Sequence, residues 1–171
     1  PKPFFYTKNL DIKFNEKVIA HSEHVKFYIS FNNFFLSENI SPKDLVFQDT
    51  EFNINSNNID FFLKALNSSD KENKFVFKKS KLFYKDQNED LLFLSKINNF
   101  SFFYDDMNNF QKVKSTFEVF NIPFKLDISK NKENDNKNIK LSSKKIRLNI
   151  ETSVEYDEAK ISGFFDISSI N

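Results

Sequence analysis

The feature that most constrains this chain is a two-residue alternation of apolar and polar side chains that recurs along most of its length. Phe124, Leu126 and Ile128, for example, alternate with Lys125 and Asp127. Successive side chains of a β-strand point to opposite faces, so the pattern predicts strands with one apolar and one polar face. Such strands are typical of a half-exposed antiparallel sheet.

Two of the predicted strands change phase part-way along. Within residues 45–54 the alternation shifts between Phe47 and Phe52, and within residues 74–86 it shifts around residues 78–81. A bulge absorbs one extra residue and keeps the apolar side chains on one face, so we expect bent, bulged strands. The two segments also resemble each other at a distance of about thirty residues, a pattern that stacked hairpins would leave.

One helix is predicted between these strands, at about residues 58–67, with Asn57 or Asn58 as its N-cap. Its apolar stripe has the spacing of a single helix face and consists of Ile59, Phe62, Leu63 and Leu66. The expected fold is therefore α+β and β-rich, a bent antiparallel sheet of long bulged strands with one principal helix. Residues 1–171 are expected to form a single domain or segment.

The composition excludes the residue patterns on which many catalytic sites are built. The chain has one glycine, no cysteine, two histidines and a formal net charge of +1. Glycine-rich phosphate loops and thiolate chemistry are excluded, and the near-neutral charge argues against nucleic acid. We expect a protein that is not an enzyme, with no catalytic residue and no cofactor.

The chain opens with Pro1-Lys2-Pro3, without Met and without the apolar core of a signal peptide. It also contains no run of about 18 apolar residues. We expect a piece of a longer protein whose membrane anchor lies elsewhere.

The two histidines are candidate metal ligands. His21 and His24 are three residues apart in an alternating segment, where side chains three apart point to opposite faces. Because no third ligand is indicated nearby, the expectation is two surface histidines and no metal site.

Clusters of acidic and basic residues are further candidates for binding sites. Asp105-Asp106 and an acidic group near the C-terminal end could supply paired carboxylates, but no calcium-loop spacing accompanies them, and solvated carboxylates are expected. The acidic group is Glu151, Glu155, Asp157 and Glu158. Lysines cluster at residues 71–85 and 130–147, yet only one of 25 cations is arginine, which disfavours bidentate phosphate recognition and therefore nucleic acid.

The 24 phenylalanines are the strongest candidate for a functional surface. Most are expected in an ordinary core, but a sheet with one helix would leave part of its apolar face uncovered, forming a groove that could hold acyl chains. The proposed lining residues are Phe27, Ile29, Phe47, Phe75, Phe77, Leu92, Leu94, Phe102, Tyr104, Phe117 and Val119.

The order of these segments resembles the AsmA-like domain of the AsmA, TamB and YhdP group of bacterial envelope proteins. The resemblance covers about residues 3–130, and its segments are the strand at 3–14, the pair 19–20 and 25–30, the turn 34–42, the strands 44–47 and 52–54, the helix 57–66, the strand–kink–strand element 75–86 and the returning strand 91–104. Group members typically carry a glycine before the position of Pro42, where this chain has Asn39.

The resemblance implies a periplasmic protein, anchored in the inner membrane, whose apolar β-groove conducts phospholipid between membranes or serves outer-membrane assembly. The partners that it implies are phospholipid acyl chains and other envelope proteins. Nucleic acid is not among the expected partners. The alternative from the residues alone is a protein-interaction or structural β module with a closed core and no lipid.

Overall fold

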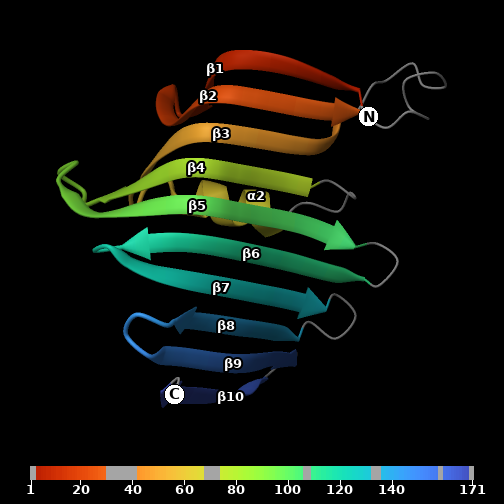
Figure 1. Ribbon diagram of the computed structural model, residues 1–171, viewed down its shortest axis with the longest axis vertical. Helices are drawn as coiled ribbons and strands as arrows, with labels where there is room; N and C mark the ends of the chain where they lie inside the picture. The colour runs from red at the N-terminus through yellow and green to blue at the C-terminus, as the bar shows by residue number, and fades with distance from the viewer. Residues whose placement is uncertain are drawn as a thin grey trace.

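The computed structural model describes residues 3–29, 42–67, 74–105, 109–131, 136–157 and 160–169. Within these ranges ten strands form one open sheet in chain order, and one short helix lies against it (Figure 1). The strands are β1 (Phe4–Phe14), β2 (Lys17–Ile29), β3 (Pro42–Ile54), β4 (Lys74–Lys85), β5 (Leu91–Asp105), β6 (Phe110–Val119), β7 (Ile122–Asn131), β8 (Lys137–Ser143), β9 (Leu148–Asp157) and β10 (Lys160–Ser169). The helix is α2 (Ile59–Asn67). The predicted β-rich sheet with one principal helix is confirmed.

Every neighbouring pair of strands is antiparallel except β3 and β4, which are parallel and joined through α2. Their register pairs Leu45 with Phe75 and Phe52 with Leu82, a constant offset of thirty residues. The similarity between these two segments therefore marks parallel neighbours. The predicted stack of hairpins is wrong at this point. The connection through α2 returns the chain to the end of the sheet where β3 begins, so β4 runs in the same direction as β3.

The two phase changes predicted for β3 and β4 belong to a continuous line of unpaired residues across β1–β5. Asn9, Glu23, Asp49, Lys79 and Asn98 are each skipped in the strand register, and each lies beside the next. Three of them, Asn9, Asp49 and Lys79, have positive φ angles of 55°, 54° and 50°. The skipped residues oppose one another, so the register from β1 to β5 does not shift along this line; it shifts only between β5 and β6, at Ile97/Asn99. In each strand the skipped residue adds one residue to the alternation, which keeps the apolar side chains before and after it on the same face. We call this line the bulge row.

Buried hydroxyl groups accompany the bulge row. Ser22 Oγ donates to the carbonyl oxygens of His24 and Gln48 at 3.2 and 3.3 Å, and Thr50 Oγ1 donates to Ser22 Oγ at 2.9 Å. On β4, Ser80 Oγ donates to the Lys78 carbonyl at 3.1 Å. A bulge disturbs the ladder of backbone hydrogen bonds, and these side chains give buried polar groups a partner.

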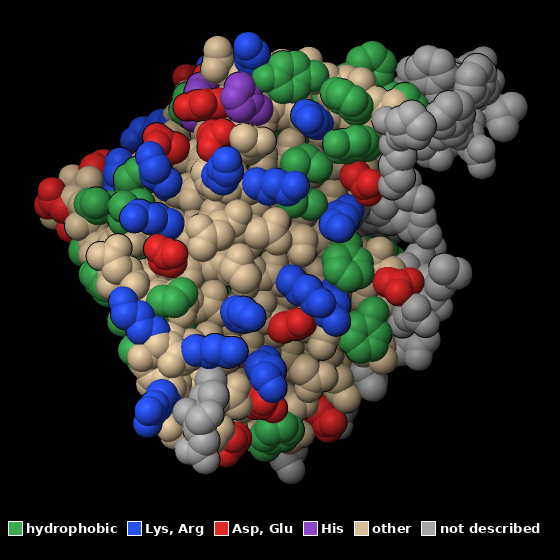
Figure 2. All heavy atoms as spheres, in the orientation of Figure 1, with side chains coloured by type: hydrophobic (Ala, Val, Ile, Leu, Met, Phe, Trp, Pro, Cys, Tyr) green, Lys and Arg blue, Asp and Glu red, His purple; other side chains and the backbone are tan. Residues whose placement is uncertain are grey.

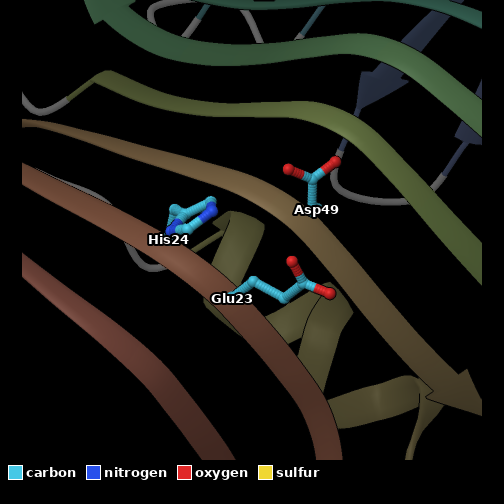
Figure 3. A group of neighbouring side chains, drawn as sticks. All are labelled: Glu23, His24 and Asp49. Carbon is cyan, nitrogen blue, oxygen red and sulfur yellow. The ribbon is translucent and has the colours of Figure 1, made fainter.

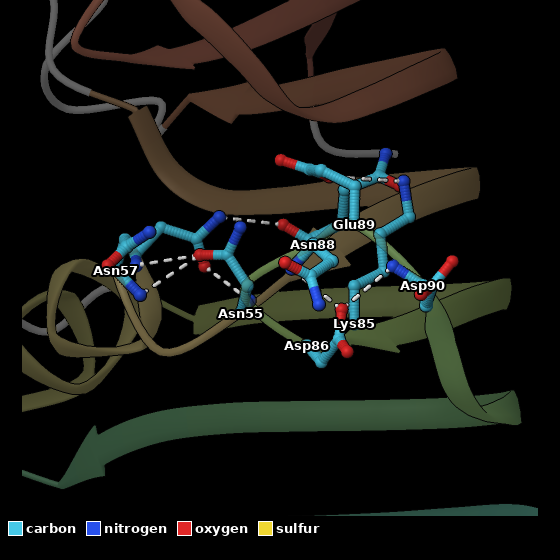
Figure 4. Close-up of polar contacts among 9 residues, drawn as sticks. Asn55, Asn57, Lys85, Asp86, Asn88, Glu89 and Asp90 are labelled. Carbon is cyan, nitrogen blue, oxygen red and sulfur yellow. Dashed lines mark hydrogen bonds and ion pairs between the residues drawn. The ribbon is translucent and has the colours of Figure 1, made fainter.

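The helix packs on one face of the sheet, the far face in Figure 1. Phe62 of α2 makes an edge contact with Phe52 of β3, with ring centroids 6.0 Å apart, and Phe61 lies 5.4 Å from Phe14 of β1. The structure corrects the predicted cap. Asn55 Oδ1 accepts hydrogen bonds from the backbone N–H groups of Asn57 and Asn58 at 3.0 and 3.2 Å, so Asn55 starts the turn that leads into the helix (Figure 4).

The turn between β4 and β5 was predicted at residues 87–90 and is confirmed. Asp86 Oδ1 accepts hydrogen bonds from the N–H groups of Asn88 and Asp90 at 2.8 and 2.9 Å, and Lys85 forms an ion pair with Glu89 (Figure 4). A carboxylate that bonds the backbone two residues on is a common way to close a turn without glycine.

Asparagine occupies four of the positive-φ positions among the described residues, a conformation for which glycine is the usual residue. Among the described residues ten non-glycine residues have positive φ, and Asn15 and Asn121 each occupy one of the two turn positions of a hairpin. Asparagine tolerates this region better than most residues because its short side chain bonds locally.

Two details of the sequence interpretation differ from the structure. Strands β8 and β10 were not predicted, because their apolar residues are few and lie among lysine, asparagine and serine. Ile146 was assigned to a strand but lies in the turn before β9. The segment 34–41, part of the family resemblance, lies outside the described residues. No helix in the described ranges is long and apolar enough to cross a membrane.

Candidate functional site

The face of the sheet that carries α2 is apolar from one edge to the other. The strand register places two rows of side chains on it, each crossing all ten strands and containing no charged residue. The first row is Phe5, Phe27, Leu45, Phe75, Phe102, Val113, Ile128, Ile139, Thr152 and Phe165, and the second is Thr7, Val25, Phe47, Phe77, Phe100, Ser115, Leu126, Leu141, Ile150 and Ile167. We call this surface the apolar face.

Aromatic rings pack against one another where the two rows cross β3–β5. Phe47 stacks on Phe77 with ring centroids 4.8 Å apart, and Phe77 contacts Phe52 at 5.0 Å and Phe100 at 5.8 Å. Such pairs stabilise by about 0.5–1.5 kcal/mol beyond their buried area. This part of the apolar face is a rigid aromatic cluster close to the helix.

Coverage of the apolar face is uneven. All nine buried hydrophobic residues of the described chain lie on β2–β5, and none lies on β6–β10. On β10, Phe165 and Ile167 remain 65% and 60% exposed. The half of the apolar face formed by β6–β10 therefore has no second layer of described residues over it.

Nine of the eleven predicted lining residues share the apolar face. They are Phe27, Ile29, Phe47, Phe75, Phe77, Phe102, Tyr104, Phe117 and Val119. The structure does not bring Leu92 and Leu94 together with them: Leu94 is paired with Phe83 on the other face, and Leu92 is the extra residue at the irregularity next to it. The alternation of 92 and 94 is genuine, but their phase relative to Phe100 is reversed by the bulge at Asn98.

Sequence reasoning missed the outer part of the apolar face. Ile139 and Leu141 of β8 and Phe165 and Ile167 of β10 belong to it. Each pair shows the two-residue spacing of a strand, which is the signal that could have found them. The strongly polar composition around them concealed it.

The opposite face is polar (Figure 2). Some of its lysines are paired across strands with acids, such as Lys81 with Glu51 at 2.9 Å and Lys114 with Asp127 at 3.9 Å. The hydrogen bond from Lys81 to Glu51, helped by the charge of Glu51, raises the pKa of the lysine. Opposite charges on directly opposed residues favour this register of the sheet. A shallow hollow on this face, lined by Tyr28, Lys74 and other residues of β2–β5, is not part of the apolar face.

The carboxylates considered from the sequence do not converge. Glu151 is bonded by Lys140, and that hydrogen bond, with a second from Asn149, lowers the pKa of Glu151. Glu155 accepts a hydrogen bond from Asn136 at 3.2 Å. Asp106 and Glu158 lie outside the described residues, as does the side chain of Asp157. Glu151 and Glu155 thus each contact a residue of a neighbouring part of the sheet.

The histidine prediction needs a correction. Because Glu23 is the extra residue of β2 in the bulge row, His21 and His24 both lie on the polar face, although three residues apart. His21 Nδ1 is 2.6 Å from Asp11 Oδ1. His24 lies with Glu23 and Asp49, a group that sequence reasoning did not find (Figure 3).

Comparison with known proteins adds no assignment. No family model matches the chain. No curated protein sequence matches it either.

Proposed function

We propose that the apolar face binds the acyl chains of phospholipids, and that the chain is a non-enzymatic lipid-binding segment of a bacterial envelope protein of the AsmA-like kind. The observation that carries this proposal is the pair of uncharged rows across all ten strands, whose β6–β10 half has no second layer of described residues. Contiguous apolar surface of this kind on a folded protein generally marks a binding site.

The dimensions of the uncovered half suit an acyl chain. Neighbouring strands lie about 4.8 Å apart, so a row from β6 to β10 spans about 19 Å. One leaflet of a bilayer accounts for half of a hydrocarbon core of about 30 Å, or about 15 Å per acyl chain. An acyl chain laid across the strands would thus remain on apolar side chains over its whole length.

A place for a headgroup lies beside the first row, on β7 and β8. Two residues along β7 from Ile128 of the first row, Lys130 lies opposite Lys137 of β8, and both lie on the apolar face. A phosphate placed there would meet two cations beside the hydrocarbon surface. This arrangement favours a phospholipid over an uncharged hydrocarbon.

The fold is compatible with the AsmA-like resemblance, which rests on long bulged strands and a helix between the third and fourth of them. A periplasmic location, an inner-membrane anchor and a role in lipid transport or outer-membrane assembly belong to this proposal. No residue of the apolar rows is a candidate for catalysis, since they contain no acid, base or nucleophile beyond isolated hydroxyls.

A protein-binding module is the second candidate, and the edge of the sheet favours it. β10 has β9 on one side and no described strand on the other, and both Phe164 and Phe165 are exposed. An open edge with apolar side chains can receive a strand from another protein. In that case the apolar face would be covered by a protein partner instead of lipid.

Adjacent phenylalanines of β10 provide a matched test. Phe165 lies on the apolar face and Phe164 on the polar face, with exposed fractions of 65% and 61%. Native mass spectrometry of the full chain, purified from bacteria, should show bound phospholipid. Phe165→Asp should lower the bound fraction several-fold, whereas Phe164→Asp should leave it within twofold.

The same samples separate the two candidates. Wild-type protein without lipid, or equal losses in the two variants, would contradict the acyl-chain proposal. A lipid-free chain that co-elutes with a protein partner, and loses it on either substitution, would support the protein-binding module. Far-UV circular dichroism of both variants should match the wild type, because both side chains are already exposed.

A further inference from the structure

We propose that Glu23, His24 and Asp49 form a binding site for one Zn²⁺ ion on the polar face of the sheet. One ligand atom from each residue lies within 4.8 Å of the others. Figure 3 shows the three side chains on the same side of the ribbon, opposite α2. The site is separate from the apolar face and does not depend on the lipid proposal.

The bulge row builds this group. In a regular strand Glu23 and His24 would point to opposite faces, but Glu23 is skipped between the pairs formed by Ser22 and His24. Asp49, also skipped, lies beside Glu23 on β3 and has a φ of 54°. Bulges of this kind re-aim side chains and are common next to functional sites. Two adjacent bulges therefore bring both carboxylates to the imidazole.

The imidazole of His24 is held in a suitable orientation. Its Nδ1 lies 2.6 Å from the hydroxyl oxygen of Tyr6, and the two rings are stacked with centroids 5.9 Å apart. With Nδ1 bonded to Tyr6, Nε2 is the nitrogen that can bind a metal. Histidines that bind metals usually donate a hydrogen bond from the other ring nitrogen, which fixes the tautomer. Asp49 is oriented in a similar way, because Gln48 Nε2 donates to its Oδ2 at 3.0 Å.

The donor set selects the metal. One imidazole and two carboxylates suit Zn²⁺, whereas Ca²⁺ and Mg²⁺ prefer oxygen ligands alone. Zinc ligands about 2.1 Å from the metal stand roughly 3.4 Å apart in a tetrahedron, so the ligand atoms of this group, which lie within 4.8 Å of one another, would need to close by up to about 1.4 Å. Glu23 is exposed and free to make that movement. Three protein ligands leave a fourth position for water.

The other histidine supplies an internal control. His21 Nδ1 lies within hydrogen-bond distance of Asp11 Oδ1, at 2.6 Å, and belongs to no such three-residue group among the described residues. The chain contains two histidines and no cysteine, so tight zinc binding must involve one of these two imidazoles. A comparison of His21 with His24 therefore distinguishes the site from nonspecific binding.

The test is isothermal titration calorimetry of the full chain with ZnCl₂, with the absorption of a Co²⁺-loaded sample as a report of nitrogen coordination. The wild type should bind one ion. His24→Gln and Asp49→Asn should each weaken binding at least tenfold, and His21→Gln should change it by less than twofold. Tyr6→Phe should weaken binding by about tenfold while the chain keeps all three ligands.

Three results would overturn the assignment. They are the absence of saturable one-to-one binding up to millimolar zinc, an equal loss in His21→Gln and His24→Gln, and unchanged binding in Asp49→Asn. Far-UV circular dichroism should show the wild-type strand signal in each variant. Because Asp49→Asn and His24→Gln alter different strands, a folding defect in one leaves the other as a valid test.

Discussion

Removal of the Ser22 hydroxyl tests whether the bulge row depends on buried side-chain hydrogen bonds. Ser22 and Thr50 are 2% and 1% exposed, and the Ser22 hydroxyl serves two carbonyl groups and the Thr50 hydroxyl. In Ser22→Ala the Thr50 hydroxyl loses its acceptor in a site closed to water. A buried polar group left without a partner costs about 1–3 kcal/mol, so we expect a loss of about 2–3 kcal/mol with the weakened carbonyls included. For a chain of this size that corresponds to a fall in Tm of about 4–12 °C.

A double-mutant cycle isolates the cause. In Thr50→Val the orphaned hydroxyl does not exist, so Ser22→Ala should cost about 1 kcal/mol less in that background. Urea unfolding followed by far-UV circular dichroism gives the free energies, since the chain has no tryptophan. Ser162→Ala, at an exposed position of β10, is the control and should change stability by less than about 0.5 kcal/mol. Additive effects of the two substitutions, or a loss below about 0.5 kcal/mol in Ser22→Ala, would refute the reasoning.

Two further predictions concern β8–β10. A Cβ atom at Gly163 would collide with the backbone carbonyl of Ser153 on β9. Gly163→Ala should therefore separate β10 from β9 and speed the exchange of the amide hydrogens between these two strands. Exchange rates that match the wild type would contradict this prediction. The pKa of Glu151 is lowered chiefly by its hydrogen bond from Lys140, so its carboxylate favours the folded state at neutral pH and that contribution disappears as the pH falls through the lowered pKa. NMR titration of Lys140→Met should return this pKa toward its ordinary range, and an unchanged value would contradict the assignment.

Much of the sheet follows from spacing alone. The shift between Phe47 and Phe52 predicts a bulge because only an extra residue keeps both rings on one face, and Asp49 is skipped in the register at that place. The turn at Asp86 is also predictable, since it depends on a side chain bonding its own neighbours. Interactions within a few residues are encoded locally, and local patterns reveal them.

The candidate sites were less accessible to sequence reasoning. The phase of Leu94 depends on a bulge at Asn98, and the register shift there appears only where β5 is paired with β6. The group formed by Glu23, His24 and Asp49 requires two bulges on different strands to lie side by side. The apolar residues of β8 and β10 can be assigned to the apolar face only from their pairing with neighbouring strands, because neither strand is apolar enough to be recognised alone.

The amino-acid sequence by itself determined that this chain forms long bulged strands with one apolar face and one helix, because period and phase are properties of consecutive residues. Only the tertiary structure decided that β3 and β4 run parallel, that α2 lies against one half of the apolar face, and that His24 meets two carboxylates. These outcomes depend on which strands become neighbours and in which register. That choice is made by side chains far apart in the chain, whose combined packing no local pattern records.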